Sequence, residues 1–508
     1  MSNFLEEEMK AMKKFLFALF AVLLLLPLKG YAEQQVAPWL TIGGDYQARL
    51  DYLQGSTPTF WSAQQAVQAM GGNPSAAATA GQDYRNNTLL TNRFGLNFVA
   101  KPLESISVKA RLVMYKVWGS ESSNPVDQNM FFMDRAGTFD GVLGHVPGSD
   151  NVLVDYAYAT WSNIADQPVW FSVGRRPSTG GVPGNLRRNA VNVGTAGVPN
   201  LLIDYAFDGF SLGWAPYIPA LPGAYAKFCG GRGFDSGFSN LHDTNFVGVF
   251  VVPYNTDQLE VQLQWDRGID VFDAPPDFQV PTTDTNGVQE FLNPTTNVGN
   301  IDWYGAVAQG KIKNINYFAA GALSDAHPNG QRAGAFAPFV KQAMGLVDPN
   351  TGFPLQDSAL TPAQLQAVKN FEPQMLDGHS HTGWALYLGA RYDIDSTRTK
   401  LGAEYNHGSR NWIGFVPAGD DMWTSKLGTR GDVYELYAIQ ELHNKVIDKV
   451  GLAYFRLGWQ YYDFKNTGSN NWLGASVAMN DLNNPMNAQF FNPIKNAQDI
   501  YLTFNVNF

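Results

Sequence analysis

The feature that most constrains this chain is the spacing of its strand-like segments. From Leu40 to the C-terminus, segments of alternating apolar and polar residues recur about 16 times. Connectors of roughly three to six residues alternate with connectors of roughly 14 to 56 residues. This rhythm predicts antiparallel strands whose short turns lie at one end and whose long loops lie at the other. A soluble sandwich or propeller would not explain the alternation of connector lengths.

The last segment of the chain shows the alternation within a strand most clearly. Between Asp499 and Phe508, every second side chain is apolar, and those between them are polar or amphipathic. Successive side chains of a strand point to opposite faces, so one face of this segment is apolar. The segment Leu259–Arg267 repeats the pattern. Strands of this kind separate an apolar environment from water.

Composition supports a barrel that spans a membrane. Aromatic residues make up 13% and charged residues 16% of the chain, and the second value is below the ~25% usual for soluble domains. The mean hydropathy is nevertheless −0.20, which argues against a bundle of membrane-spanning helices. In a barrel, half of each strand faces water. The net charge of −10 argues against nucleic-acid binding.

We therefore predict an all-β fold, a transmembrane antiparallel β-barrel of about 16 strands. Both ends of the mature chain and the short turns are expected on the periplasmic side, and the long loops outside the cell. Barrels of this size leave an aqueous channel. The longest insertion, 325–380, is expected to be a large extracellular loop with a helix at Thr361–Asn370, capped by Thr361. The segment Ala224–Gly230 has the weakest pattern, and an even strand count requires it to be a strand.

The N-terminus predicts a secretory signal peptide at residues 1–32. A lysine-rich stretch precedes the apolar run Phe15–Leu26, which is shorter than the ~20 residues that a spanning helix needs. Gly30 and Ala32 supply small residues before a cleavage site, so the mature barrel is expected to comprise residues 33–508. We therefore expect export to the outer membrane of a Gram-negative bacterium.

Two further features carry a resemblance to a known family. The chain ends on Phe508 at the end of a strand, and the stretch Val173–Pro177, which contains Gly174, Arg175 and Arg176, precedes a glycine-rich loop. The chain resembles bacterial outer-membrane porins, and is most similar to an uncharacterised porin-like family of metal- and sulfur-respiring proteobacteria. The resemblance implies a passive channel for small hydrophilic or anionic solutes, with lipid and lipopolysaccharide around it. A homotrimer is one possible assembly, although the acidic constriction-loop signature of general trimeric porins is absent.

The third long loop, residues 176–208, occupies the position of the constriction loop in porins. Rings of cationic side chains in a narrow pore favour anions. The arginines of this region could instead pair with carboxylates or bind lipopolysaccharide phosphates. Alternation along the strands directs further charged side chains inward. The residues expected to line the pore are Arg175, Arg176, Arg187, Arg188, Arg93, Arg111, Arg49, Asp45, Glu260, Arg391 and Arg456.

No catalysis, metal or cofactor is expected. None of the seven histidines lies in a recognisable nucleophile motif. His379 and His381, with Asp377 nearby, could form a metal pair, but they lack a clear third ligand. Cys229 is the only cysteine, so the chain has no internal disulfide.

Two other functions remain open. The barrel could be the scaffold of an electron conduit and enclose a separate multihaem cytochrome, which would favour a wider barrel. Alternatively, it could be a receptor or adhesin that acts through the loop 325–380.

Overall fold

The structure is a computed structural model. It describes residues 33–508, except 71–74, 120–144, 146, 148–149, 177–180, 182, 185, 191–200, 236–242, 273–279, 284–287, 293–296, 331–339, 343, 372–378, 417–420, 444–450, 470–475 and 490–491. The expected signal peptide, residues 1–32, lies outside the described part of the chain.

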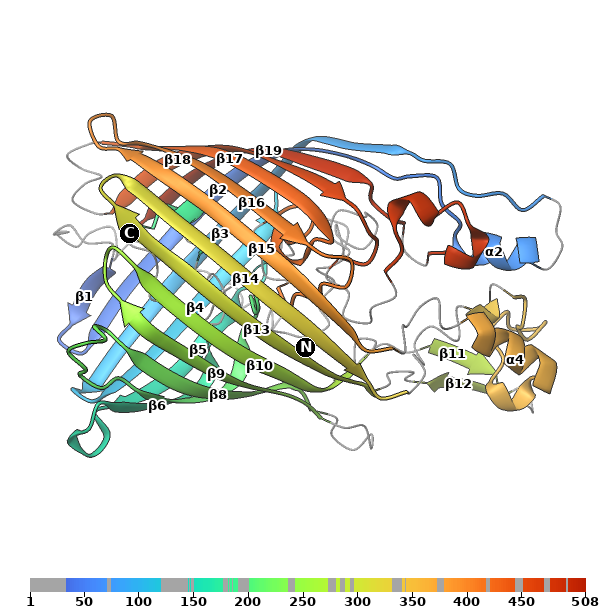
Figure 1. The fold of residues 1–508 in the computed structure, drawn as a ribbon, viewed down its shortest axis with the longest axis horizontal. Helices are drawn as coiled ribbons and strands as arrows, with labels where there is room; N and C mark the ends of the chain where they lie inside the picture. The colour runs from blue at the N-terminus through green and yellow to red at the C-terminus, as the bar shows by residue number, and fades with distance from the viewer. Residues whose placement is uncertain are drawn as a thin grey trace, which may run out of the picture.

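The chain forms a closed antiparallel barrel (Figure 1). The sheet has 17 strands, of which 16 close the barrel and confirm the expected number. The remaining strand, β1 (Glu33–Ala37), pairs only with the start of β2 among the described residues. In order round the barrel, the wall strands are β2 (Leu40–Ser56), β3 (Asp83–Leu103), β4 (Ile106–Val117), β5 (Leu153–Ser162), β6 (Val169–Arg176), β7 (Phe207–Trp214), β8 (Tyr225–Phe234), β9 (Thr244–Asn255), β10 (Glu260–Phe272), β13 (Asn297–Ile312), β14 (Ile315–Pro328), β15 (His381–Ile394), β16 (Thr399–Gly408), β17 (Gly431–Glu441), β18 (Leu452–Phe464) and β19 (Asn496–Asn507). The weakest expected strand is therefore confirmed as β8.

The barrel closes where the last strand meets the first wall strand. β19 pairs antiparallel with β2, from Asn496 opposite Ser56 to Asn507 opposite Asp45. The terminal residue continues this ladder, because the Phe508 N–H donates to the Gly44 carbonyl at 2.9 Å and its own carbonyl accepts from the Gly44 N–H. A Cβ atom at position 44 would lie 2.8 Å from the Phe508 ring. Glycine at this position therefore leaves room for the terminal aromatic ring.

The outer face of the wall is apolar. Along β15 and β19, residues that face outward are exposed, whereas their neighbours that face the lumen are buried. A continuous apolar exterior is the surface that a barrel presents to lipid. Large apolar residues exposed on this face include Leu50, Leu212, Leu263, Tyr392, Leu436, Leu457 and Leu502.

The long loops all leave the same end of the barrel, and several extend well beyond it (Figure 1). They carry the helices α2 (Ala63–Met70) and α4 (Pro362–Phe371) and the small hairpin of β11 (Val280–Thr283) and β12 (Gln289–Leu292). The helix expected at Thr361–Asn370 is confirmed. Its cap is also confirmed, because Thr361 Oγ1 accepts from the Gln364 N–H at 3.3 Å and Gln364 Oε1 accepts from the Thr361 N–H at 3.0 Å. Among the described helices, none has the length and apolar composition to cross a bilayer.

Candidate constriction inside the barrel

The third long loop joins β6 to β7, and its described residues, 181, 183–184, 186–190 and 201–206, fold into the lumen. Its 3₁₀ turn η4 (Leu186–Arg188) reaches β15 and β18, on the opposite side of the barrel. Arg391 Nη1 donates to the Leu186 carbonyl at 2.8 Å, and Arg456 Nη1 donates to the Arg187 carbonyl at 2.7 Å. Arg391 and Arg456, both expected in the lumen, thus donate to backbone carbonyls of this loop. These carbonyls are not paired within a sheet.

Arg187 joins this loop to a second inward loop. The second loop is the seventh long one, residues 409–430 between β16 and β17. Arg187 Nη1 lies 2.5 Å from Asp421 Oδ1 and 3.3 Å from Glu435 Oε2. Lys426 belongs to the same seventh loop, and it contacts Glu404 on β16 and Glu435 on β17. Burial alone would lower the pKa of Arg187, but these carboxylates outweigh burial and raise its pKa well above the ordinary value. We call Arg187, Asp421, Lys426, Glu404 and Glu435 the loop lock.

The loop lock should withstand mild acid. Burial alone would raise the pKa of Asp421, but Arg187 and Lys426 outweigh burial and hold that pKa below its usual range. The contribution of Asp421 to the stability of the fold is therefore complete above the pKa of about 3.9 that this carboxyl has in the unfolded chain. It is lost as the pH falls through the lower pKa that the carboxyl has in the folded barrel. We expect the urea midpoint of the purified barrel to change little from about pH 7 to about pH 5 and to fall below about pH 4. In Asp421→Asn, the urea midpoint should fall less at low pH. A midpoint that has already fallen fully at pH 5 would contradict the lowered pKa of Asp421.

The two inward loops also pack through an apolar cluster. Phe415 lies at its centre, with ring centroids 5.0 Å from Tyr205, 5.0 Å from Phe246 and 6.0 Å from Trp303. The backbones join as well, because the Asp204 N–H donates to the Phe415 carbonyl at 2.9 Å. The third and seventh loops therefore form one packed unit against the inner wall of β7, β9 and β13.

A different environment remains on the β2–β5 side of the lumen. Arg111 Nη1 lies 2.6 Å from Asp45 Oδ1, and Arg111 Nε lies 3.2 Å from Asp155 Oδ2. Arg93 Nε lies 3.8 Å from Asp45 Oδ2. The Arg93 and Asp45 side chains retain 18% and 21% exposure, unlike the loop lock, whose side chains are no more than 7% exposed.

Arg188 is half-buried and belongs to the loop side of this region. Its carbonyl accepts from the Tyr454 hydroxyl at 3.1 Å. Tyr454 lies on β18, which only β19 separates from β2. The third loop thus brings a cation toward the partly exposed charges of the β2–β5 wall.

The remaining expected residues occupy different places. Arg49 is buried within the wall, where its Nε lies 2.6 Å from Asp51 Oδ1 and its Nη2 lies 2.8 Å from Asp499 Oδ2. Glu260 is buried at the short-turn end, where its Oε2 accepts from Gln309 Nε2 at 2.6 Å. Arg176 faces inward, beside Phe207 and Lys227.

Arg175 lies on the opposite face of the wall from Arg176. Strand β6 continues through Arg176, so alternation along the strand decides where both arginines point. The register places Arg175 opposite Asp208 on the outer face, which it shares with the exposed Val173. The expectation for Arg175 rested on its closeness in sequence to Arg176, Arg187 and Arg188 rather than on alternation along the strand.

The seventh loop was not anticipated as part of the site. It was expected outside the barrel, yet it supplies Asp421 and Lys426 to the loop lock. A sequence signal was present, because this segment carries more large apolar residues than a solvated loop needs. These residues are Trp412, Ile413, Phe415, Val416, Met422 and Trp423, all of which are buried.

Two sequence patterns bear on the question of a reactive or metal site. Gly209–Gly213 matches the spacing Gly-x-Ser-x-Gly, but it lies within β7, whereas a nucleophile elbow needs a strand-to-helix turn. Among the described residues, no group of three or more His, Cys, Asp or Glu side chains could hold a metal ion. Asp377, proposed beside His379 and His381, lies outside the described residues.

Comparison with known protein families shows to which family this chain belongs. The profile of the family described as "Protein of unknown function (DUF3373)" matches residues 83–508, which include every wall strand except β2. The chain belongs to this family. The match leaves the expected metal- and sulfur-respiring hosts untested. Comparison with curated protein sequences gives no match.

Several solved outer-membrane proteins resemble the DUF3373 barrel distantly. OmpF of Salmonella typhi in complex with daunomycin is 9% identical and aligns over 93% of this chain and 99% of its own, with a TM-score of 0.43. An anion-selective porin from Comamonas acidovorans is 9% identical over 92% of this chain and 99% of its own, with a TM-score of 0.41. The trimer form of OmpT, an outer membrane protein of Vibrio cholerae, is 10% identical over 92% and 99%, with a TM-score of 0.39. Likeness at this level says nothing about selectivity.

Proposed function

We propose that this chain is an outer-membrane channel that passes small hydrophilic solutes, with a preference for anions. The observation that carries this proposal is the third loop, which crosses the lumen and carries the half-buried Arg188 to β18, on the side of the barrel next to the wall that holds Arg93 and Arg111. In a passage lined by walls of low dielectric constant, such charges raise the local concentration of anions. Asp45 and Asp155 offset part of the positive charge, so the preference is expected to be moderate.

The other functions receive less support. A conduit would need a lumen wide enough for a separate multihaem cytochrome, whereas two loops of this chain pack inside the barrel. A receptor could use the loops beyond the barrel, where Ala66, Val340, Val368 and Ala488 form a small shared apolar cluster. That cluster packs the described parts of these loops against one another.

The surroundings of the channel follow from its outer face. The apolar belt would contact lipid. At the long-loop end, Arg232 is 42% exposed beside Asp235 and Asp243. Arg175 lies on the same face, opposite Asp208. These arginines are candidates for contact with lipopolysaccharide phosphates, which is the alternative role that the sequence analysis gave to arginines of this region. The assembly, monomer or trimer, can be read from the number of equal current steps in each insertion event.

Replacing the partly exposed arginines should weaken the preference for anions. Under a tenfold salt gradient, a fully anion-selective pore gives a reversal potential of about 59 mV, and a moderate preference gives a fraction of this value. We expect Arg93→Gln/Arg188→Gln to move the reversal potential toward cations by roughly a third of the wild-type value. The measurement is single-channel current in a planar bilayer with the mature protein.

A matched control separates selectivity from folding. Arg85→Gln removes the same charge from β3, but from an exposed side chain that lies against Tyr52. It should leave the reversal potential unchanged. A correctly folded wild-type barrel without any conductance would overturn the channel proposal.

A further inference from the structure

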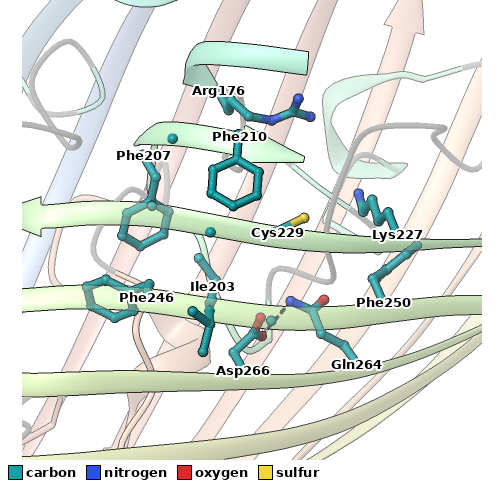
Figure 2. Close-up of a pocket in the computed structure, with 15 residues that line it drawn as sticks. Arg176, Ile203, Phe207, Phe210, Lys227, Cys229, Phe246, Phe250, Gln264 and Asp266 are labelled. Carbon is teal, nitrogen blue, oxygen red and sulfur yellow. Dashed lines mark hydrogen bonds between the residues drawn. The ribbon is translucent and has the colours of Figure 1, made fainter. Parts of the chain in front are cut away.

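A small cavity lies on the inner wall away from the β2–β5 side. Strands β6 to β10 surround it, and Ile203 of the third loop covers part of it (Figure 2). Its volume is about 60 Å³. Gly209, Gly231 and Gly248 line it from inward positions on three adjacent strands.

The cavity has cations on one side and acceptors on the other. In Figure 2, Arg176 and Lys227 lie toward one end, while Gln264 and Asp266 lie toward the opposite end. Lys227 is 8% exposed, Gln264 is 6% exposed and Asp266 is 5% exposed. Gln264 Nε2 donates to Asp266 Oδ2, so the Gln264 Oε1 atom is the acceptor left to other partners.

Two buried polar atoms of this cavity lack a hydrogen bond. They are Arg176 Nη1 and Gln264 Oε1, for which no partner exists among the described residues. Buried donors and acceptors in native proteins are nearly always satisfied by protein, water or ligand. One donor and one acceptor therefore remain for a molecule that enters the cavity.

Size and charge restrict that molecule. The cavity is less than half of the roughly 150 Å³ that accommodates benzene, which leaves room for only a few heavy atoms. Arg176 and Lys227 outnumber the single carboxylate of Asp266, so the site favours a monoanion. A guanidinium group matches planar anions that present two oxygen atoms. The acceptors at the other end favour an anion that keeps an O–H group.

We propose that this cavity binds a small planar oxyanion that carries one O–H donor, of which bicarbonate is the simplest example. Two oxygen atoms of the anion face Arg176 and Lys227, and the O–H donates toward Gln264 and Asp266. The site lies on a different part of the wall from Arg93, Arg111 and Arg188. Binding there does not depend on whether the barrel conducts.

The only cysteine of the chain supplies a direct test. Cys229 is half-buried and lines the cavity, so a bound anion should protect its thiol. The measurement is the rate at which iodoacetamide alkylates Cys229 in the purified mature barrel at constant pH and ionic strength. Bicarbonate and nitrate serve as probes, because they share size, planarity and charge but only bicarbonate has an O–H. Gluconate, which is too large to enter, balances the ionic strength.

We expect bicarbonate to slow alkylation in a saturable way and nitrate to do so at least about tenfold less effectively, since one charged hydrogen bond separates them. Arg176→Gln should raise the half-protecting bicarbonate concentration by at least about tenfold. Arg85→Gln, the same change on the outer face, should leave it unchanged. The heat-dependent electrophoretic mobility of each variant reports whether its barrel is folded.

Three results would overturn the proposal. They are protection by neither anion, equal protection by both anions, and full protection in folded Arg176→Gln. If wild-type Cys229 reacts too slowly, broadening of the ¹³C signal of labelled bicarbonate by wild type, but not by Arg176→Gln, decides the question. None of these readouts measures current, so failure here is distinct from failure of the channel proposal.

Discussion

Arg187→Met should release the third loop from the seventh and destabilise the barrel by about 3–5 kcal/mol, the usual cost of breaking a buried ion pair from one side. The change leaves Asp421 and Glu435 buried without the cation that lies 2.5 Å and 3.3 Å from them. Methionine keeps much of the side-chain volume, so the loss is one of charge rather than packing. The free energy of unfolding in urea measures it, and single-channel current should rise because the loop is no longer held.

Replacing the carboxylate of Asp421 by an amide should restore much of the stability that Arg187→Met loses. In Arg187→Met/Asp421→Asn, one of the two carboxylates that lose Arg187 becomes an amide, so the double variant should be more stable than Arg187→Met alone. Arg85→Met makes the same substitution at an exposed site and should change the unfolding free energy by less than about 0.5 kcal/mol. A loss for Arg187→Met no larger than that of Arg85→Met would show that the loop lock contributes nothing.

Phe415→Ala should cost about 3–5 kcal/mol, the range for truncating a buried phenylalanine. The Phe415 side chain is 1% exposed and lies among Tyr205, Phe246 and Trp303. Its removal leaves a cavity where the two inward loops meet the wall. We expect a lower urea midpoint together with larger or noisier current steps, because both loops lose their common packing partner.

Phe455→Ala is the matched control for this experiment. Phe455 is 40% exposed on the outer face of β18, where lipid can fill the space that the ring leaves. Its replacement should cost much less stability and leave the current unchanged. Equal effects of the two substitutions would mean that the inner cluster has no special role in holding the loops.

The wall could be predicted from sequence because its determinants are local. In a strand, side chains two residues apart point to the same face. A few residues are therefore enough to show the alternation along Asp499–Phe508 and Leu259–Arg267. The position of β8 followed from the even strand count, although its own pattern is weak. At Arg175, closeness in sequence to the loop arginines favoured the lumen, whereas alternation along β6 places the residue on the outer face.

The interior could not be predicted in the same way. The loop lock joins Arg187 to Asp421 and Glu435, which are 234 and 248 positions away in sequence. No local pattern encodes such a pairing, because it depends on how two loops fold back through a closed wall. The third loop was expected inside the barrel by resemblance to porins, whereas nothing in that resemblance pointed to the seventh. Its apolar content was the available signal.

The seam between β2 and β19 has a consequence for how the barrel is completed. Arg49 on β2 contacts Asp499 on β19, 450 positions away, and both side chains are almost fully buried. A shift of one residue along the seam would turn one of these charges toward lipid and separate it from the other. Incorrectly joined barrels are thereby disfavoured at the final step of assembly. The pair thus acts as a check on register at the one junction that no hairpin turn can set.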